Sequence, residues 1–361
     1  LHFYLQGQQP EGFVKTSQLQ EQDPQSKNEL YDLLTFDTDI GKDSVDIWQE
    51  FENIFQRLNG FTYYRDIYQP YHKAAFDSLL ADGVQHVEIR ARLNGGLYDL
   101  ENPKNYYNSD SLVMALKEVM EEVQLEHPEF TLKLIYTSIR LGTKEVVLDQ
   151  LINAYHIRKK YPDLVVGFDL VANEDDGNTT LYFLENWLKM DSLNQAFGID
   201  MPLYLHDGES NWSTLTNLYD AVLLNSRRIG HGFNLAHYPT LIEQVKQKNI
   251  SIEISPLSNQ ILGYVSDLRM HPGQYFLANG VQCTISSDDP GVFGYNGLSY
   301  DYWSIFLAWE LDLRSLKKLV MNSLEYSSLN DKEKQRAFEH WESQWQKFIK
   351  YADGYLDELI I

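Results

Sequence analysis

Four short segments in the second half of the chain place acids and bases directly after apolar runs. They are residues 205–209, 228–232, 255–259 and 286–290. A short apolar run that ends in a loop is typical of a buried strand. In a barrel of parallel strands, the carboxyl ends of the strands form the face on which active sites are built. We therefore expect His206, Glu209, His231, Asp288 and Asp289 to meet on one face, as in a metal-assisted hydrolase.

The rest of the chain alternates strand-like and helix-like runs. Strands are expected at residues 1–6, 85–93, 131–139, 165–171, 202–206, 227–231, 251–255 and 282–287. Between them, residues 111–125, 146–160 and 238–248 carry apolar side chains at spacings of three and four, which is typical of helices that cover a sheet. Eight such strands predict an α/β fold, a (β/α)₈ TIM barrel that spans residues 1–361 as one domain.

Two segments depart from this alternation. Residues 8–42 are rich in Gln, Asp, Glu and Lys, and they predict a polar insertion near the first strand, mobile in part. The last 60 residues predict helices only, over 311–329 and 332–352. In the second of these, Phe338, Trp341, Trp345 and Phe348 recur at spacings of three and four, which predicts packing against the barrel.

Charge and composition exclude several classes of partner. The formal net charge of −22 disfavours binding to nucleic acid or to an anionic membrane, because both would repel the chain. No apolar run approaches the roughly 18 residues that a membrane span needs. The lone Cys283 lies in an apolar run, so we expect a buried thiol and no internal disulfide.

The order of the motifs resembles the adenosine deaminase family of metal-dependent aminohydrolases. The resemblance rests on a Leu-His start at His2, on His-x-Gly-Glu at 206–209, on Arg-Ile-Gly-His-Gly at 228–232, on Ser-Asn at 258–259 and on Ser-Asp-Asp-Pro at 287–290. Residues 87–93, 167–171, 265–272 and 297–301 are similar to its secreted, growth-factor-related branch. That branch implies a secreted or extracytoplasmic protein and a homodimer.

The resemblance also implies a substrate, a cofactor and a set of roles. The substrate would be a small purine nucleoside, adenosine-like, whose C–N bond is hydrolysed with Zn²⁺ as cofactor. His206, Asp288 and His2 would be the metal ligands. Glu209 would shuttle protons, His231 would position the attacking water and Asp289 would bond the N7 edge of the purine. The remaining substrate contacts would come from the backbone N–H of Ala172 and from Asn173, Gln6 and Trp212.

These residue types suit the chemistry independently of the family. Hydrolytic deamination needs a hydroxide at neutral pH, and Zn²⁺ can supply one by lowering the pKa of its bound water to about 7. It also needs a proton donor, a task for a carboxylic acid, and a group such as His that orients the hydroxide. Each residue has an ordinary structural role open to it as well: Asp288 and Asp289 could cap a helix, and Trp212 could simply cover the barrel.

Some residues depart from the family pattern. Tyr4 stands where the family has a second His ligand, Gln6 where it has an acid, Ala172 where it has a Gly, and Asp207 where Ala is usual. Tyr is a poorer Zn²⁺ ligand than imidazole, so the metal would bind weakly or not at all. Alternatively, the first strand lies upstream of residue 1. Asp207 should point away from His206, since side chains alternate along a strand.

Three functions therefore compete. They are a working deaminase, a barrel hydrolase with a changed substrate, and a catalytically impaired relative that acts as a nucleoside-binding or growth-factor-like protein. Glu88 and Arg90 alternate along the strand at 85–93, where a structural ion pair is favoured over a role in the pocket.

Overall fold

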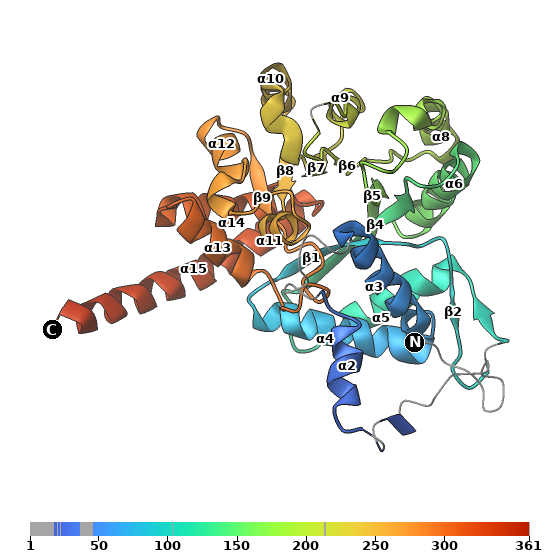
Figure 1. Ribbon diagram of the computed structural model, residues 1–361, viewed down its shortest axis with the longest axis horizontal. Coiled ribbons are helices and arrows are strands. Elements are labelled where there is room, and N and C mark those ends of the chain that lie inside the picture. The colour runs from blue at the N-terminus through green and yellow to red at the C-terminus, as the bar shows by residue number, and fades with distance from the viewer. Residues whose placement is uncertain are drawn as a thin grey trace.

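Two parallel sheets form the centre of the molecule (Figure 1). The computed structural model describes residues 18, 19, 21, 23–36, 46–102, 104–212 and 214–360, the last five without their side chains. One sheet has the order β1-β4-β5 and the other β6-β7-β8-β9. Their strands are β1 His86–Ala91, β4 Thr131–Ile139, β5 Val165–Val171, β6 His206–Asp207, β7 Arg228–His231, β8 Ser251–Ile254 and β9 Cys283–Ile285. The predicted α/β class with parallel strands is confirmed.

The strands follow one another in chain order, and each lies inside or beside a predicted range. A bridge between Phe168 and Leu203 joins β5 to the segment that leads into β6. The predicted strand at 1–6 lies outside the described residues. A short antiparallel pair, β2 Leu97–Tyr98 and β3 Tyr106–Tyr107, was not predicted, because two-residue strands leave no periodic signal.

Helices separate most of the strands. They are α2 Ser26–Asp32, α3 Ile47–Thr62, α4 Arg65–Ala81, α5 Ser109–Gln124, α6 Lys144–Lys160, α7 Leu184–Trp187, α8 Met190–Phe197, α9 Asn217–Leu223, α10 Pro239–Gln247, α11 Pro256–Ile261, α12 Gly273–Ala278, α13 Ser299–Ala308, α14 Leu313–Glu325 and α15 Asp331–Ile360. Short 3₁₀ turns η1 Thr180–Phe183, η2 Phe233–His237 and η3 Leu268–Met270 complete them. In the described part of the chain, no helix is long and apolar enough to cross a membrane.

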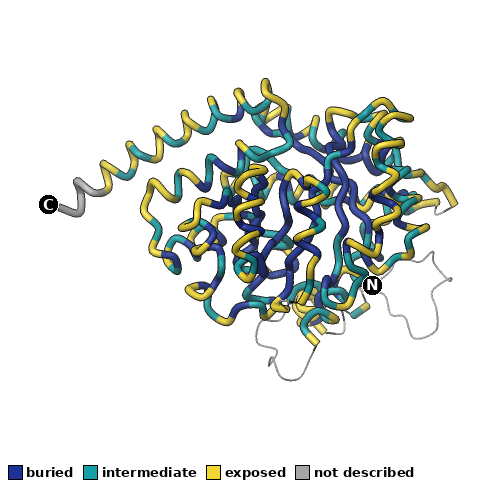
Figure 2. Tube along the Cα trace, turned by 90° about the horizontal axis from the view of Figure 1, so that it is seen from above, coloured by how far each residue is buried: buried dark blue, intermediate teal, exposed yellow. Residues whose placement is uncertain are grey.

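Most of the strands are buried on both faces, as is usual in parallel sheets, while β1 is half-buried over most of its length. In β4, residues 132–138 are all buried, and one large apolar cluster joins the sheets to the inner faces of their helices. Figure 2 shows these buried strands at the centre of the molecule and exposed helix faces around them. Cys283 is fully buried, and burial raises the pKa of its thiol, which fits the predicted structural thiol.

Charged side chains cross between the two sheets. Arg228 of β7 contacts Glu88 of β1 and places its Nε 2.5 Å from Glu253 of β8. Arg90 of β1 places Nη2 2.5 Å from the other oxygen of Glu253. Glu88 and Arg90 thus form ion pairs, as the structural alternative predicted. The two sheets therefore share one charged interior, formed by side chains of β1, β7 and β8.

The C-terminal helices agree with the prediction except at their end. Phe338 and Trp341 pack on a small cluster of Leu324, Leu329 and Ala337. Phe348 is 42% exposed, so its predicted packing against the barrel is wrong. The reason is geometric: α15 continues to Ile360 and its second half projects from the body (Figures 1 and 2).

Candidate active site

Imidazole and carboxylate groups converge at the carboxyl ends of β6, β7 and β9. His206 begins β6, His231 ends β7, and Asp288 follows β9. The rings of His206 and His231 lie 5.0 Å apart. Glu209 Oε1 is 3.4 Å from His231 Nδ1, and Asp288 Oδ2 is 3.8 Å from His231 Nε2. The structure thus brings together four residues that the sequence analysis placed on one face.

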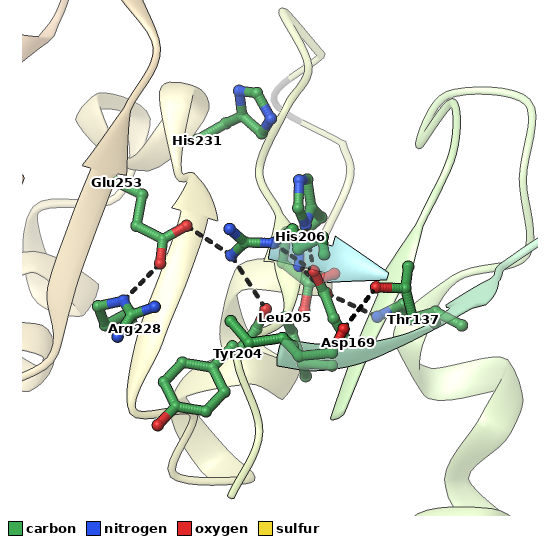
Figure 3. Close-up of polar contacts among 12 residues, drawn as sticks. Thr137, Asp169, Tyr204, Leu205, His206, Arg228, His231 and Glu253 are labelled. Carbon is green, nitrogen blue, oxygen red and sulfur yellow. Dashed lines mark hydrogen bonds and ion pairs between the residues drawn. The ribbon is translucent and has the colours of Figure 1, made fainter. Parts of the chain in front are cut away.

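Asp169, at the centre of β5, orients His206. Its Oδ2 lies 2.7 Å from His206 Nδ1, and its Oδ1 accepts the backbone N–H of the same residue at 2.9 Å (Figure 3). Asp169 is fully buried, and His206 and Arg90 overcome that burial and hold the pKa of its carboxyl well below its usual value. This carboxylate fixes the His206 tautomer and leaves Nε2 free to bind a ligand. The sequence analysis assigned Asp169 no role.

Glu209 is buried beside the two imidazoles. Burial, with Asp288 and Glu174 nearby, raises its pKa well above the ordinary value. Its Oε1 makes no hydrogen bond with the described residues. Its backbone N–H donates to Glu174 Oε2 at 2.6 Å, and the N–H of Gly208 donates to Glu174 Oε1 at 2.9 Å. Glu174, which the sequence analysis also missed, therefore clamps the loop that carries Glu209.

His231 is held neutral by its surroundings. Its side chain is 4% exposed, and burial, opposed by Asp288, lowers its pKa to about 4. Its backbone has a φ of +61°, a left-handed conformation that non-glycine residues adopt mainly at constrained sites. Asn259 in α11 lies 3.3 Å from its Nδ1.

The pKa values of Asp288 and Asp289 are shifted in opposite directions. Burial would raise the pKa of Asp288, but the nearby His231 and His206 lower it. The pKa of Asp289 is raised well above its usual value by burial and by the charge of Asp288. These surroundings thus favour the anion at Asp288 and the protonated form at Asp289. Glu209, His231 and Asp288 each offer a ligand atom within 4.8 Å of the others.

Asp207 points away from His206, as predicted. Its Oδ1 accepts from Thr180 Oγ1 at 2.6 Å and lies 3.3 Å from Nη2 of Arg140, which is fully buried. The same Arg140 guanidinium donates to the carbonyl of His206. The unusual acid therefore belongs to a support beneath the β6 loop.

Three of the other residues predicted to contact the substrate, Ala172, Asn173 and Trp212, are described by the structure. Ala172 follows β5 with a φ of +89°. Asn173 uses its amide within its own loop, accepting from Asp175 N at 3.0 Å and donating to Asp176 at 3.1 Å. Trp212 is 56% exposed. His2, Tyr4 and Gln6 lie outside the described residues.

Ala172→Gly should stabilise the protein. A non-glycine residue at this φ strains the folded backbone by about 1–3 kcal/mol. Glycine removes that strain, but it loses more chain entropy on folding, which offsets part of the gain. We expect the free energy of unfolding, measured by urea denaturation, to rise by about 1 kcal/mol. Asn249→Gly is the matched control, because Asn at a φ of +54° tolerates the conformation and should gain less. A less stable Ala172→Gly protein would show that the alanine carries no strain.

The chain was compared with known proteins. The sequence profile of the family described as adenosine deaminase matches residues 30–343. Adenosine deaminase 2 of Dictyostelium discoideum is 39% identical over 90% of this chain and 60% of its own length. Adenine deaminase of Arthrobacter aurescens has a similar fold, with a TM-score of 0.70, 19% identity and 89% of each chain covered. A Zn-bound amidohydrolase from Burkhoderia ambifaria has a TM-score of 0.66 and 17% identity, over 81% of this chain and 76% of its own.

The chain spans about 60% of the length of that curated relative. The profile match covers most of the chain, and the motifs at 206–209, 228–232 and 287–290 all lie within it. The chain belongs to the adenosine deaminase family, in the branch of adenosine deaminase 2.

Proposed function

We propose that the chain is a metal-dependent hydrolytic deaminase of an adenosine-like purine nucleoside. One observation carries the proposal: a buried Glu209 with a raised pKa and an unengaged Oε1 lies beside a neutral His231 and an ionised Asp288. A carboxyl whose pKa is raised and a carboxylate whose pKa is lowered, a few ångströms apart, suit the two carboxyl functions that such a hydrolysis needs.

The residues fit a bound Zn²⁺. His206 keeps Nε2 free because Asp169 engages Nδ1, and the Asp288 carboxylate is 19% exposed and lowered in pKa. Nitrogen and carboxylate oxygen donors are those that Zn²⁺ prefers. We assign His206 and Asp288 as ligands, with His2 as the third. Glu209 is left out of this set because its raised pKa disfavours the carboxylate form that binds a metal. When bound, the metal supplies Lewis acidity toward water.

Side chains of the protein would transfer the protons, orient the water and bind the purine. Glu209 would hold a proton for N1 of the purine and then for the leaving ammonia. His231 would orient the attacking water. Asp289 would bond N7, which is an acceptor; the carboxyl needs a proton to donate to it, and its raised pKa favours that form. Ala172, Asn173, Gln6 and Trp212 remain proposed substrate contacts.

We also propose that the two sheets close into one (β/α)₈ barrel and that residues 8–42 are an insertion within this single domain. The ion pairs between β1 and β7 or β8 support closure, because residues of well-separated strands meet only in a closed interior. Secretion and a homodimer remain predictions from the resemblance.

A catalytically impaired relative that binds nucleosides is the second candidate. It is favoured by Tyr4 and Gln6, which replace a ligand and an acid of the family pattern. Metal content separates the two functions: the purified chain is dialysed against Zn²⁺ and assayed by absorbance on adenosine. Metal uptake with turnover supports the deaminase. No turnover with full metal excludes adenosine as the substrate, and no metal at saturating Zn²⁺ favours the impaired relative.

Tyr4→His should tighten metal binding if residues 1–6 are the first strand. Imidazole replaces a phenol that must lose a proton before it can bind the metal well. The expected results are slower Zn²⁺ loss on dialysis and a higher kcat on adenosine. Tyr31→His, at a tyrosine that is 58% exposed in α2, is the control. Unchanged Zn²⁺ loss in Tyr4→His would mean that Tyr4 is not at the metal position or is itself an adequate ligand, and the assignment of residues 1–6 as the first strand would be abandoned.

A further inference from the structure

Three polar groups form a line behind His231. The backbone N–H of Gly273 donates to His271 Nδ1 at 2.9 Å. His271 Nε2 lies 3.1 Å from Asn259 Oδ1. Asn259 Nδ2 lies 3.3 Å from His231 Nδ1. We call Gly273, His271 and Asn259 the amide relay, because its direction is set by the backbone amide at its far end.

The direction of each bond follows from the one before it. A backbone N–H can only donate, so His271 Nδ1 accepts. Burial lowers the pKa of His271 to about 3, so its neutral ring carries the proton on Nε2, which donates to Asn259 Oδ1. Asn259 must then present its NH₂ group to His231. His231 Nδ1 therefore accepts, and its single proton lies on Nε2.

The amide relay has little freedom to reverse. Asn259 is 0% exposed and His271 is 4% exposed. The His271 ring packs edge-on against Phe233, with centroids 5.2 Å apart, and at a tilt against Trp309, with centroids 5.6 Å apart. The backbone of Asn259 is held in α11 by a bond from its N–H to Ser255. A flip of the amide would set two donors against each other at His271, which is costly in a buried site.

We infer that the amide relay fixes His231 as the Nε2–H tautomer, with its Nε2–H toward Asp288 and its Nδ1 lone pair occupied by the Asn259 amide. His271 and Asn259 are then positioning residues for His231. Resting on the proposed function, the inference defines how His231 works: it orients the attacking water by donating from Nε2. Because its Nδ1 carries no proton, His231 donates no hydrogen bond to Glu209 Oε1, which lies 3.4 Å away.

Nitrogen-15 NMR of histidine-labelled protein tests the tautomer without any need for activity. In the unsubstituted chain, the His231 resonances should show a protonated Nε2 and an unprotonated Nδ1. His231→Gln identifies these signals. A protonated Nδ1 in the unsubstituted chain would overturn the inference.

Asn259→Asp should reverse the tautomer, because the introduced carboxylate accepts from both histidines. The expected results are a protonated Nδ1 on His231, a kcat at least tenfold lower and a KM within about twofold. Asn322→Asp is the matched control: Asn322 is a buried amide that donates to the Cys283 carbonyl at 2.9 Å. It should lower stability but leave the His231 signals and the kcat of the folded protein unchanged. His231 signals in Asn259→Asp that match those of the unsubstituted chain would contradict the relay.

His271→Phe is the second variant, used if Asn259→Asp fails to fold. It keeps an aromatic ring between Phe233 and Trp309 but removes the hydrogen-bonding nitrogens. Without a donor at Oδ1, the Asn259 amide is free to turn, so His231 should show a mixture of tautomers. A single Nε2–H tautomer in this variant would overturn the role of His271. If the unsubstituted chain deaminates no nucleoside, the proposed function fails, and the NMR result alone decides the inference.

Discussion

Glu209→Gln should lower kcat for adenosine by about three orders of magnitude. General acid catalysis contributes typically 10²- to 10⁴-fold, and an amide cannot pass a proton to N1 or to the leaving ammonia. The substitution keeps the size of the side chain. The clamp from Glu174 binds the backbone N–H of residue 209 and is unaffected. KM and metal content should therefore change little, and steady-state kinetics with metal analysis measure both.

Glu243→Gln is the control for Glu209→Gln. The Glu243 side chain is 60% exposed and pairs with Lys246 on α10, so its loss should leave kcat unchanged. Two outcomes would contradict the assignment. A kcat within tenfold of that of the unsubstituted chain would exclude Glu209 as the proton shuttle. A loss of bound metal would show that Glu209 is a ligand.

Arg228→Met should destabilise the fold by about 3–5 kcal/mol, the usual cost of removing one member of a buried ion pair. Arg228 is 6% exposed and contacts Glu88 and Glu253, whose side chains are each 9% exposed. Methionine fills a similar volume, so the loss would come from charge rather than from a cavity. Two carboxylates would remain buried with Arg90 as the guanidinium partner of Glu253. Urea denaturation at neutral pH measures the change.

The size of this effect should depend on pH. Burial alone would raise the pKa values of Glu88 and Glu253, but Arg228, with His86 at Glu88 and Arg90 at Glu253, lowers both below 4.5. A depressed folded-state pKa stabilises the protein above the unfolded value, and that stability is lost as pH falls through the folded value. Without Arg228 the folded-state pKa values of Glu88 and Glu253 rise. Lowering the pH then protonates both carboxylates and removes the unpaired buried charge that destabilises the variant. The difference from the unsubstituted chain should be largest at neutral pH and should narrow below about pH 4.5.

Arg227→Met tests whether this loss is specific. Arg227 is the exposed neighbour of Arg228 in the sequence, and a surface substitution of this kind usually changes stability by less than about 0.5 kcal/mol. If Arg228→Met were as stable as Arg227→Met at neutral pH, the charged interior would contribute nothing to the fold.

The sequence predicted what depends on local patterns. The strands at β4, β5, β7 and β8 were located because each is a short apolar run with a polar end, and α5, α6 and α10 because their apolar residues recur at helical spacing. The extent of α15 was not predictable in the same way. Its aromatic spacing continues past the point where the body ends, and periodicity does not report whether a partner surface is present.

In the site too, the sequence predicted residues placed by local patterns and missed residues that act through distant contacts. His206, Glu209, His231 and Asp288 follow strands and could be placed by that position alone. Asp169, Glu174 and His271 act through hydrogen bonds to residues 37, 35 and 12 positions away along the chain. One sequence contains no signal for such pairings, although Asp169 within an apolar strand was a visible anomaly, because charged residues are seldom fully buried without a partner.

Anomalous X-ray scattering at the zinc edge, from crystals grown with Zn²⁺, tests the proposed metal site most directly. We expect one strong peak within bonding distance of His206 Nε2 and an Asp288 oxygen, about 2.0–2.2 Å for such ligands, with Glu209 and His231 close by but unbound. No peak at saturating Zn²⁺, or a peak held by Glu209 and His231 without His206, would contradict it.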